Sequence, residues 1–254
     1  MTILHVTDFH FNQRWFDWLL RAAPANDLTV LSGDLLDARA STPLRAQIEW
    51  VTTWLNAFPR PLCVCSGRHD LEWEPARQRW MPAYWLRELR NPLVRTDGQR
   101  VVLNGVSVLS IGATTRPKGG DADVWVVHTP PAGTLVATRG DGVESGDRDL
   151  MAAVLRHQPQ LVLSGHVHAP LHWRERRDGT VFVNPGRNPA AAFPNHVLVR
   201  TDTQQCQLIA GPRVHGRPLD FAASVVAPLR DEDLPAASGF SQSGTEAAIA
   251  PALL

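Results

Sequence analysis

The sequence predicts an α/β protein with a central sheet that is covered on both faces. Short runs rich in Val, Ile and Leu recur along the chain, and helical patterns separate several of them. The runs are continuously apolar rather than alternating, which is typical of strands buried on both faces by helices or by a second sheet. The chain has 254 residues, 44% of them hydrophobic and 20% charged, so it can bury a sizeable core and is not a disordered chain.

Each predicted strand is a short run of apolar residues. The clearest runs cover residues 3–7, 28–32, 62–65, 106–111, 124–127 and 161–163. Residues 100–104 and 106–111 flank Gly105 as the two strands of a hairpin would, and further strands are predicted over 180–183 and 196–200. We therefore expect an α/β core followed by a half that is rich in strands.

Three helices are predicted between these strands. The first is short and carries Phe16, Leu19 and Leu20. The second covers residues 44–58, where apolar residues recur at helical spacing, and Ser41 or Thr42 is placed to cap it. Asp147 is placed to cap the third, which ends near Pro159. Helix therefore alternates with strand in much of the chain.

The net charge and the cysteine content limit the classes of partner and the cellular compartment that we expect. The 25 Lys and Arg balance 25 Asp and Glu, so no global positive field gathers nucleic acid or an anionic membrane. There is no apolar run of about 18 residues, and the first residues do not read as an export signal. Cys63, Cys65 and Cys206 are too few for a disulfide framework. We expect buried thiols and a cytoplasmic protein.

Side chains that bind metals or transfer protons stand just beyond the carboxyl ends of predicted strands. They are Asp8, His10, Asp34, His69, Asp70, His128, His166 and His168. Any one of them alone is more often a turn, cap or core residue. In open α/β sheets, however, ligands bind outside the carboxyl ends of the strands, so the whole set is expected in one crevice. Gly33, Gly67 and Gly165 let the backbone turn sharply close to an ion.

The types of these residues indicate a metal centre. Asp and His ligands without a matching set of Cys favour Mn, Fe, Ni or Zn in a mixed oxygen and nitrogen site. A central carboxylate can bridge two ions about 3.5–4 Å apart, which is the two-metal arrangement for in-line displacement at phosphorus. Asp34 is placed for this bridge. The sequence therefore predicts one or two divalent or transition metal ions.

The order Asp-x-His, Gly-Asp, Gly-x-His-Asp, His and Gly-His-x-His over residues 1–187 resembles the calcineurin-like metallophosphoesterase superfamily. The resemblance includes the Val-Asn-Pro-Gly turn at 183–186. It implies a four-layer α-β-β-α sandwich of two mixed sheets flanked by helices, which we assign to a domain over residues 1–228. It also implies that Asp8, His10, Asp34 and His168 hold one metal, and that Asp34, His128 and His166 hold the other.

The resemblance further implies a metal-dependent hydrolase of phosphate monoesters or diesters. A metal-activated hydroxide would attack phosphorus in line, and His69, oriented by Asp70, would assist the leaving group as a general acid. The expected substrate is a small-molecule phosphate ester. A nuclease acting on ends or single strands, and a catalytically weakened scaffold that binds proteins, are the alternatives. Arg187, just after the turn, is a weaker candidate for a phosphate contact.

Arg68 departs from the pattern of the family. The family's third motif has Asn where this chain has Arg68, and a guanidinium cannot coordinate a cation. Three interpretations remain open. The second metal binds without this ligand, with water or Asn12 in its place and Arg68 turned toward the substrate. Alternatively, Arg68 replaces the charge of that metal in a one-metal enzyme and grips phosphoryl oxygens. In the third interpretation the centre is degraded.

From about Leu229 onward the sequence loses its periodicity and is rich in Ala, Pro, Ser and Gly. Residues 229–254 are therefore predicted to form an extended or mobile tail.

Overall fold

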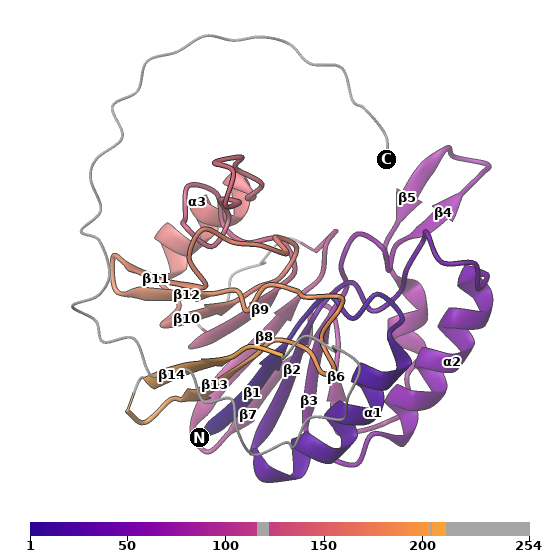
Figure 1. Cartoon of the computed structure of the whole chain (residues 1–254), viewed down its shortest axis with the longest axis horizontal. Helices are drawn as coiled ribbons and strands as arrows, with labels where there is room; N and C mark the ends of the chain where they lie inside the picture. The colour runs from indigo at the N-terminus through magenta and orange to yellow at the C-terminus, as the bar shows by residue number, and fades with distance from the viewer. Residues whose placement is uncertain (116–121, 204, 212–254) are drawn as a thin grey trace, which may run out of the picture.

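The computed structural model describes residues 1–115, 122–203 and 205–211. It contains two six-stranded mixed sheets packed face to face, with helices on their outer faces (Figure 1). The predicted α/β class and the four-layer arrangement are thereby confirmed. The predicted tail at 229–254 lies outside the described residues. No helix in the described ranges is long and apolar enough to cross a membrane.

The first sheet combines the beginning of the chain with its last described strands. Its order is β14-β13-β1-β2-β3-β6. The strands are β1 (Thr2–Val6), β2 (Leu28–Ser32), β3 (Leu62–Cys65), β6 (Val94–Arg95), β13 (His196–Arg200) and β14 (Gln205–Ile209). The four strands from β1 to β6 run parallel, and β13 pairs with β1 in the antiparallel sense. The carboxyl ends of β1, β2 and β3 therefore lie at one edge.

The second sheet is built from the strand-rich half that the sequence predicts. Its order is β11-β12-β10-β9-β8-β7. The strands are β7 (Arg100–Leu103), β8 (Val106–Ile111), β9 (Val124–Val127), β10 (Leu161–Leu163), β11 (Arg174–Arg177) and β12 (Thr180–Val183). The central strands β8, β9, β10 and β12 run parallel. The edge strands β7 and β11 are antiparallel members of hairpins.

Helices cover the outer faces of the two sheets (Figure 1). They are α1 (Gln13–Ala22), α2 (Leu44–Ala57) and α3 (Arg148–His157), with short 3₁₀ turns η1 (Ala23–Ala25) and η2 (Tyr84–Glu88). Asp147 caps α3 as predicted, because its side chain accepts a hydrogen bond from the Leu150 N–H at 3.0 Å. The predicted Ser41 or Thr42 cap of α2 is wrong. Pro43 precedes this helix, and no side chain caps it.

Three apolar layers hold the sheets and helices together. Aromatic residues such as Trp15, Phe16 and Trp54 pack between the first sheet and α1 and α2. Between the two sheets lie aliphatic side chains together with Cys63 and Cys65, both fully buried. Burial raises the pKa of the Cys63 thiol to about 12. A third layer fills the space under α3. The predicted burial of the cysteines is confirmed, and Cys206 is buried as well.

A hairpin that the sequence did not predict follows β3. Strands β4 (Glu72–Glu74) and β5 (Arg79–Met81) form a two-stranded sheet that projects from the body of the molecule (Figure 1). Trp73 and Trp80 face each other across it, with ring centroids 5.3 Å apart, and both are nearly half exposed. The segment is too short and too charged to give a strand pattern by itself.

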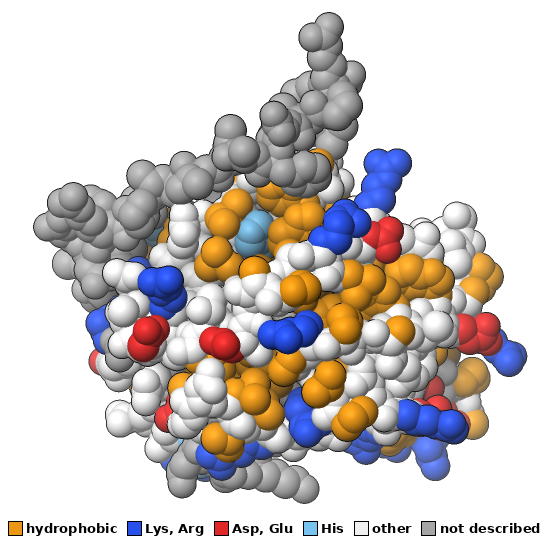
Figure 2. All heavy atoms as spheres, turned by 90° about the horizontal axis from the view of Figure 1, so that it is seen from below, with side chains coloured by type: hydrophobic (Ala, Val, Ile, Leu, Met, Phe, Trp, Pro, Cys, Tyr) orange, Lys and Arg blue, Asp and Glu red, His pale blue; other side chains and the backbone are white. Residues whose placement is uncertain are grey.

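The balance of basic and acidic residues is visible on the face of the molecule shown in Figure 2. Basic and acidic side chains are interspersed there with apolar ones, and neither sign of charge forms a continuous field. This agrees with the equal numbers of basic and acidic residues in the sequence.

Candidate metal centre

The loops after β1, β2, β3, β9 and β10 bring most of the predicted site residues together. Among the described residues, three groups of side chains each place one ligand atom per residue within 4.8 Å of the others. The groups are Asp8, His10 and His168; His10, Asp34 and His69; and Asp8, Asp34 and His128. Because the groups share members, they form one cluster at the carboxyl ends of these strands.

One half of the cluster is formed by Asp8, His10 and His168. The Nε2 atoms of the two histidines lie 3.2 Å apart. Asp8 Oδ1 lies 3.3 Å from His168 Nε2 and 3.7 Å from His10 Nε2. Three donor atoms therefore face a common point, which is the arrangement expected of metal ligands.

Asp34 links this half to the other. Its Oδ2 atom lies 3.6 Å from His10 Nε2 and 3.3 Å from His128 Nε2. The carboxylate therefore stands between histidines of the two predicted metal positions. This is the placement that a bridging ligand requires.

Two buried atoms in the cluster lack the partners that buried polar atoms normally have. Asp8 Oδ1 and His128 Nε2 are inaccessible to solvent, and among the described residues neither makes a hydrogen bond of regular geometry, although His168 Nε2 and Asp34 Oδ2 lie 3.3 Å away. An unpaired buried polar group costs on the order of 1–3 kcal/mol. Both atoms belong to ligand groups, so a metal cation would supply the missing interactions. The donor set thus fits a metal ion.

Hydrogen bonds to neighbouring atoms fix the orientation of the ligands. Thr7 Oγ1 and the His166 N–H donate to Asp8 Oδ2 at 2.7 and 3.0 Å, and the His69 N–H donates to Asp34 Oδ1 at 2.9 Å. His128 Nδ1 lies 2.9 Å from the Ser32 carbonyl oxygen. A proton on Nδ1 leaves the Nε2 lone pair for a metal. Asp8, Asp34 and His128 therefore each use one atom for the scaffold and keep another for the centre.

The charges of the cluster also favour a cation. Burial alone raises the pKa of Asp34, but His128 and His10 outweigh it, so the pKa falls to about 2. The pKa of Asp8 likewise lies well below its usual range, because the neighbouring histidines outweigh the effect of burial. The opposite holds for His128, where Asp34 and Asp8 overcome burial and raise the pKa to about 10. A bound metal would replace the proton that His128 otherwise holds.

The backbone at four of the predicted ligands adopts a left-handed conformation that residues other than glycine rarely take. Asp8, His10, Asp34 and His166 have φ angles of 54°, 43°, 51° and 67°. Such left-handed residues cost on the order of 1 kcal/mol or more each and persist where the surroundings hold them. Here the loops turn back at the strand ends, which points the side chains into the cluster.

Glycines leave the space that the ligands need. A Cβ at Gly67 would overlap Asp34 Oδ1, and one at Gly165 would overlap Thr7 Oγ1 and crowd Asp8 Oδ2. Gly33, at φ +85°, has the His128 ring in the place of a Cβ. The three glycines that the sequence analysis singled out therefore admit close approach of backbone to ligand.

His69 lies at the edge of the cluster. Its ring centroid is 4.7 Å from that of His10, in an edge-to-face contact. Its Nδ1 atom accepts a hydrogen bond from the Ala38 N–H at 3.2 Å and lies 3.9 Å from Asp37 Oδ1. An Nδ1 that accepts a hydrogen bond leaves the proton of the neutral ring on Nε2. His69 is thereby set up as a donor.

The expectation that Asp70 orients the His69 ring directly is wrong. The carboxylate of Asp70 accepts from two backbone groups, the Leu36 N–H at 2.9 Å and the Gly67 N–H at 2.7 Å. Burial, followed by the charge of Asp34, raises its pKa to about 7. Asp70 is fully buried and ties the loop after β2 to the loop after β3. It therefore acts on the position of His69 only through the backbone.

His166 and Arg68 line a groove beside the cluster. The His166 ring is 5.2 Å from that of His128, but His166 belongs to none of the three ligand groups. Arg68 is exposed. Both line an open groove of about 700 Å³, together with residues such as Thr129 and Arg148. Burial, His128 and Arg68 lower the pKa of His166 to about 4, so its ring is neutral at pH 7, as a metal ligand must be.

Asn184 is a structural support of the site that the sequence analysis did not identify as such. Its side chain is fully buried, and Nδ2 lies 2.9 and 3.0 Å from the carbonyl oxygens of Gly165 and Val167. Its Oδ1 accepts from the Gly186 N–H at 2.8 Å. Asn184 therefore holds the loop that carries His166 and His168. The Val-Asn-Pro-Gly turn marked the position but not this role.

Comparison with known proteins agrees with the fold and the site. A family model of the calcineurin-like phosphoesterases matches residues 1–170, and the chain belongs to this family. It is a metal-dependent hydrolase of phosphoric esters. No curated protein matches the sequence.

Two solved structures illustrate how far the fold is shared. The protein TT1561 of Thermus thermophilus is 16% identical, with a TM-score of 0.57, over 82% of this chain and 97% of its own. The purple acid phosphatase PPD1 from yellow lupin seeds is 14% identical, with a TM-score of 0.50, over 84% of this chain and 52% of its own. At these identities the likeness concerns the fold alone.

Proposed function

We propose that this chain hydrolyses small phosphate esters at a centre of two metal ions. In this proposal Asp8, His10, Asp34 and His168 hold one ion, and Asp34, His128 and His166 hold the other. The observation that carries the proposal is the pair of buried, unpartnered ligand atoms, Asp8 Oδ1 and His128 Nε2, in a cluster centred on Asp34. A structural role alone would leave those atoms unsatisfied.

The donor set suits Mn, Fe, Ni or Zn, because it combines carboxylate oxygen with imidazole nitrogen. When bound, such ions supply Lewis acidity toward phosphoryl oxygens and lower the pKa of water toward 7. The buried cysteines fit the reducing cytoplasm that the sequence predicts.

His69 is the proposed general acid. Because Nδ1 accepts from the Ala38 N–H, the ring of His69 offers its Nε2 proton at the edge of the cluster. When the ring is protonated on both nitrogens, transfer of the Nε2 proton to the departing oxygen would neutralise the alkoxide as it forms and leave a neutral imidazole. In the protonated ring Nδ1 would exchange its contact with the Ala38 N–H for one with Asp37 Oδ1, 3.9 Å away. Burial lowers the pKa of His69, whereas the charges of Asp34 and Asp37 favour the protonated form.

Arg68 is proposed to bind the substrate rather than to degrade the site. Its side chain is exposed and lines the groove beside His166, where it can reach phosphoryl oxygens with paired N–H donors. The ligand atoms around Asp34 lie within 4.8 Å of one another, which supports an active enzyme over a scaffold. Whether the second ion binds beside Arg68 or is replaced by it is decided by metal content.

The test of this function combines metal analysis with an assay. Protein purified without chelator should contain at least one transition metal per chain, and should hydrolyse p-nitrophenyl phosphate or its bis ester in added Mn²⁺. Asp34→Asn should lose both properties. The matched control is Asp141→Asn, which removes a carboxylate from an exposed ion pair with Arg139. Absence of metal and of hydrolysis in the unmodified protein would favour the scaffold.

A further inference from the structure

Arg187 forms hydrogen bonds with both loops that carry ligands of the first predicted metal ion, the loop of Asp8 and the loop of His168. Its backbone N–H donates to the carbonyl oxygen of His168 at 2.7 Å, and its side-chain Nε donates to the carbonyl oxygen of Asp8 at 2.8 Å. Asp8 and His168 belong to the same ligand group, although they are far apart in the sequence. Arg187 therefore connects the backbone of the two loops that carry Asp8 and His168.

The guanidinium of Arg187 also contacts an aromatic ring. It lies over the ring of Trp15, 5.6 Å from the centroid. Trp15 is itself buried, and its Nε1 lies 3.3 Å from the Ala191 carbonyl oxygen. A guanidinium fixed between a carbonyl group and an aromatic face loses little further freedom when it binds a ligand. The arginine is thus pre-organised.

The two Nη atoms of this arginine remain available to donate hydrogen bonds to a ligand. Within the part of the chain that the structure describes, the side chain makes one hydrogen bond, through Nε. An arginine has five N–H donors, so the two Nη atoms keep four. Burial lowers the pKa of Arg187, but the carboxylates of Asp8, Asp37 and Asp34 act in the opposite direction. The group remains a cation beside the cluster.

Its position complements that of Arg68. Arg68 is exposed and approaches from the groove on the side of His166. Arg187 is half-buried and approaches from the side of Asp8 and His168. A phosphoryl group at the metal cluster would then have a guanidinium on each of two sides. Of the two, only Arg187 is fixed to the ligand loops.

We propose that Arg187 is a substrate-binding residue that grips an anionic oxygen of the phosphoryl group with its two Nη atoms. This inference rests on the proposed function and adds a binding residue that the metal motifs do not include. The ligand class is a phosphate ester or the orthophosphate product, because planar paired donors match tetrahedral oxyanions.

The test uses Arg187→Gln and Arg187→Lys in the metal-loaded protein. We expect the inhibition constant of orthophosphate and the KM of p-nitrophenyl phosphate to rise about 10-fold or more in the glutamine variant, since charge-assisted hydrogen bonds are lost. Lysine should recover part of this loss because it restores the charge. Arg45→Gln, on the exposed surface of α2, is the control and should match the unmodified protein.

Two further measurements separate substrate binding from support of the loops. Metal content and melting temperature should be nearly unchanged in Arg187→Gln, whereas orthophosphate titrated calorimetrically should bind more weakly. An unchanged phosphate affinity with a loss of metal would overturn the inference and make Arg187 a purely structural residue. If the unmodified protein hydrolyses no ester, the proposed function fails, but the calorimetric comparison still decides whether Arg187 binds phosphate.

Discussion

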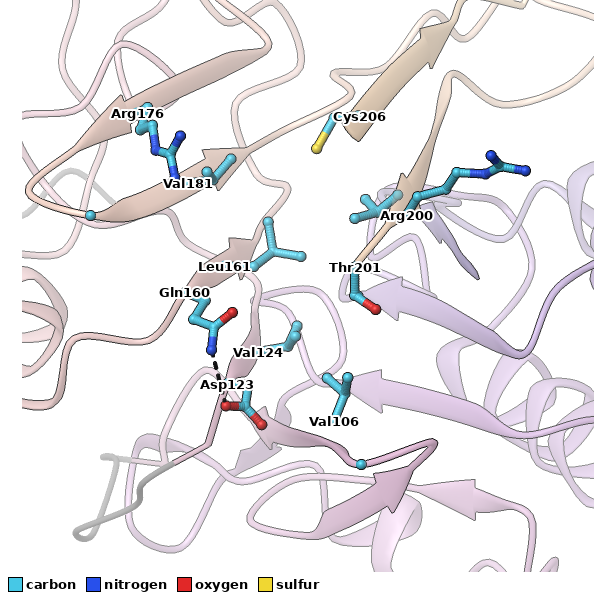
Figure 3. Close-up of a pocket in the computed structure, with 13 residues that line it drawn as sticks. Val106, Asp123, Val124, Gln160, Leu161, Arg176, Val181, Arg200, Thr201 and Cys206 are labelled. Atoms are coloured by element: carbon cyan, nitrogen blue, oxygen red, sulfur yellow. Dashed lines mark hydrogen bonds between the residues drawn. The ribbon is translucent and has the colours of Figure 1, made fainter. Parts of the chain in front are cut away.

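The two ends of the β-sandwich use carboxylates in opposite ways. At the metal end, Asp8 Oδ1 is buried and, within the part of the chain that the structure describes, makes no regular hydrogen bond, with the His168 ring 3.3 Å away in an ion-pair contact. At the other end, Asp123 borders a pocket of about 180 Å³ between the sheets (Figure 3). Asp123 accepts from the Ser107 N–H and hydroxyl at 2.8 and 2.7 Å, and Gln160 Nε2 lies 3.3 Å from its other oxygen. A carboxylate with its partners in place is structural, whereas one without them marks a site for a cation.

The backbone differs between the two ends as well. Around the pocket of Figure 3, positive φ angles occur at the hairpin turns Asn104-Gly105 and Asp178-Gly179, where Asn, Asp and Gly are suited to them. At the metal end they occur at the ligands themselves, including the histidines His10 and His166. The strained conformation is therefore kept where the chemistry requires it.

The largest effect that would test this comparison is expected from Asp34. Asp34→Ala removes the carboxylate that faces His10 and His128, so hydrolysis should fall by more than the roughly 100-fold that supporting residues of metal sites cost. Metal content should fall below one ion per chain. Asp123→Asn, at the opposite end, should keep both properties. If Asp123→Asn were as damaging, the two carboxylates would not differ in role.

The glycines give the next largest effect. Gly165→Ala places a methyl group on Thr7 Oγ1 and against Asp8 Oδ2, so the loop must shift and metal binding should be lost. Gly105→Ala is the matched change at the other end, where a Cβ has open space but φ is +78°. It should cost about 1 kcal/mol of stability and no activity. Elemental analysis and chemical denaturation measure the two quantities.

Asn184 should give a smaller loss at the metal end. Asn184→Ala removes the donor to the Gly165 and Val167 carbonyl groups. The free energy of unfolding should fall by about 1–3 kcal/mol for the unsatisfied buried groups, and metal affinity by about 10-fold to 100-fold. Chelator competition measures the affinity. A stable variant with unchanged metal affinity would show that the loop keeps His168 in place by itself.

The smallest effect at neutral pH concerns a buried histidine, His5, whose influence on stability begins only below about pH 6.5. Burial lowers the pKa of His5 to about 3, against 6.5 in an exposed chain. Above pH 6.5 the ring is neutral in both states; below it, only the unfolded chain takes up the proton. This residue therefore destabilises the fold as pH falls from 6.5 toward 3, by up to about 1.4 kcal/mol per pH unit.

The measurement is a denaturation series between pH 7 and 4.5 on the metal-free protein. His5→Gln can keep the contact with the Ser32 hydroxyl, which lies 2.8 Å from Nε2 in the native chain. The variant should lose less stability across this range than the unmodified protein. Equal losses would mean that His5 is not the group that resists protonation.

Much of the fold followed from the sequence because the buried strands are continuously apolar. Residues 28–32, 62–65 and 124–127 were predicted with the boundaries that β2, β3 and β9 have. The hairpin of β4 and β5 and the strand β11, Arg-Glu-Arg-Arg, were missed since charged residues hide their pattern. Their strand form depends on a pairing partner and not on their own composition.

The site was predictable as a set of residues but not as a network. Motif order placed Asp8, Asp34 and His128 at strand ends, and the structure brings them together. Order along the chain cannot reveal which atom accepts from which backbone group, so Asp70 was assigned to the wrong partner. The same limit explains why Arg187 stood out only weakly. Its significance comes from two carbonyl groups that are distant in sequence.

Cys63 and Cys65 turn the layer between the sheets into a built-in reporter of unfolding. Both thiols are fully enclosed, and burial raises the pKa of each, so neither forms the reactive thiolate while the sheets stay closed. A thiol reagent should modify them only as fast as the two layers separate. β3 leads directly into the loop of Arg68 and His69. The labelling rate with and without metal would therefore measure how much metal binding slows the separation of the two sheets.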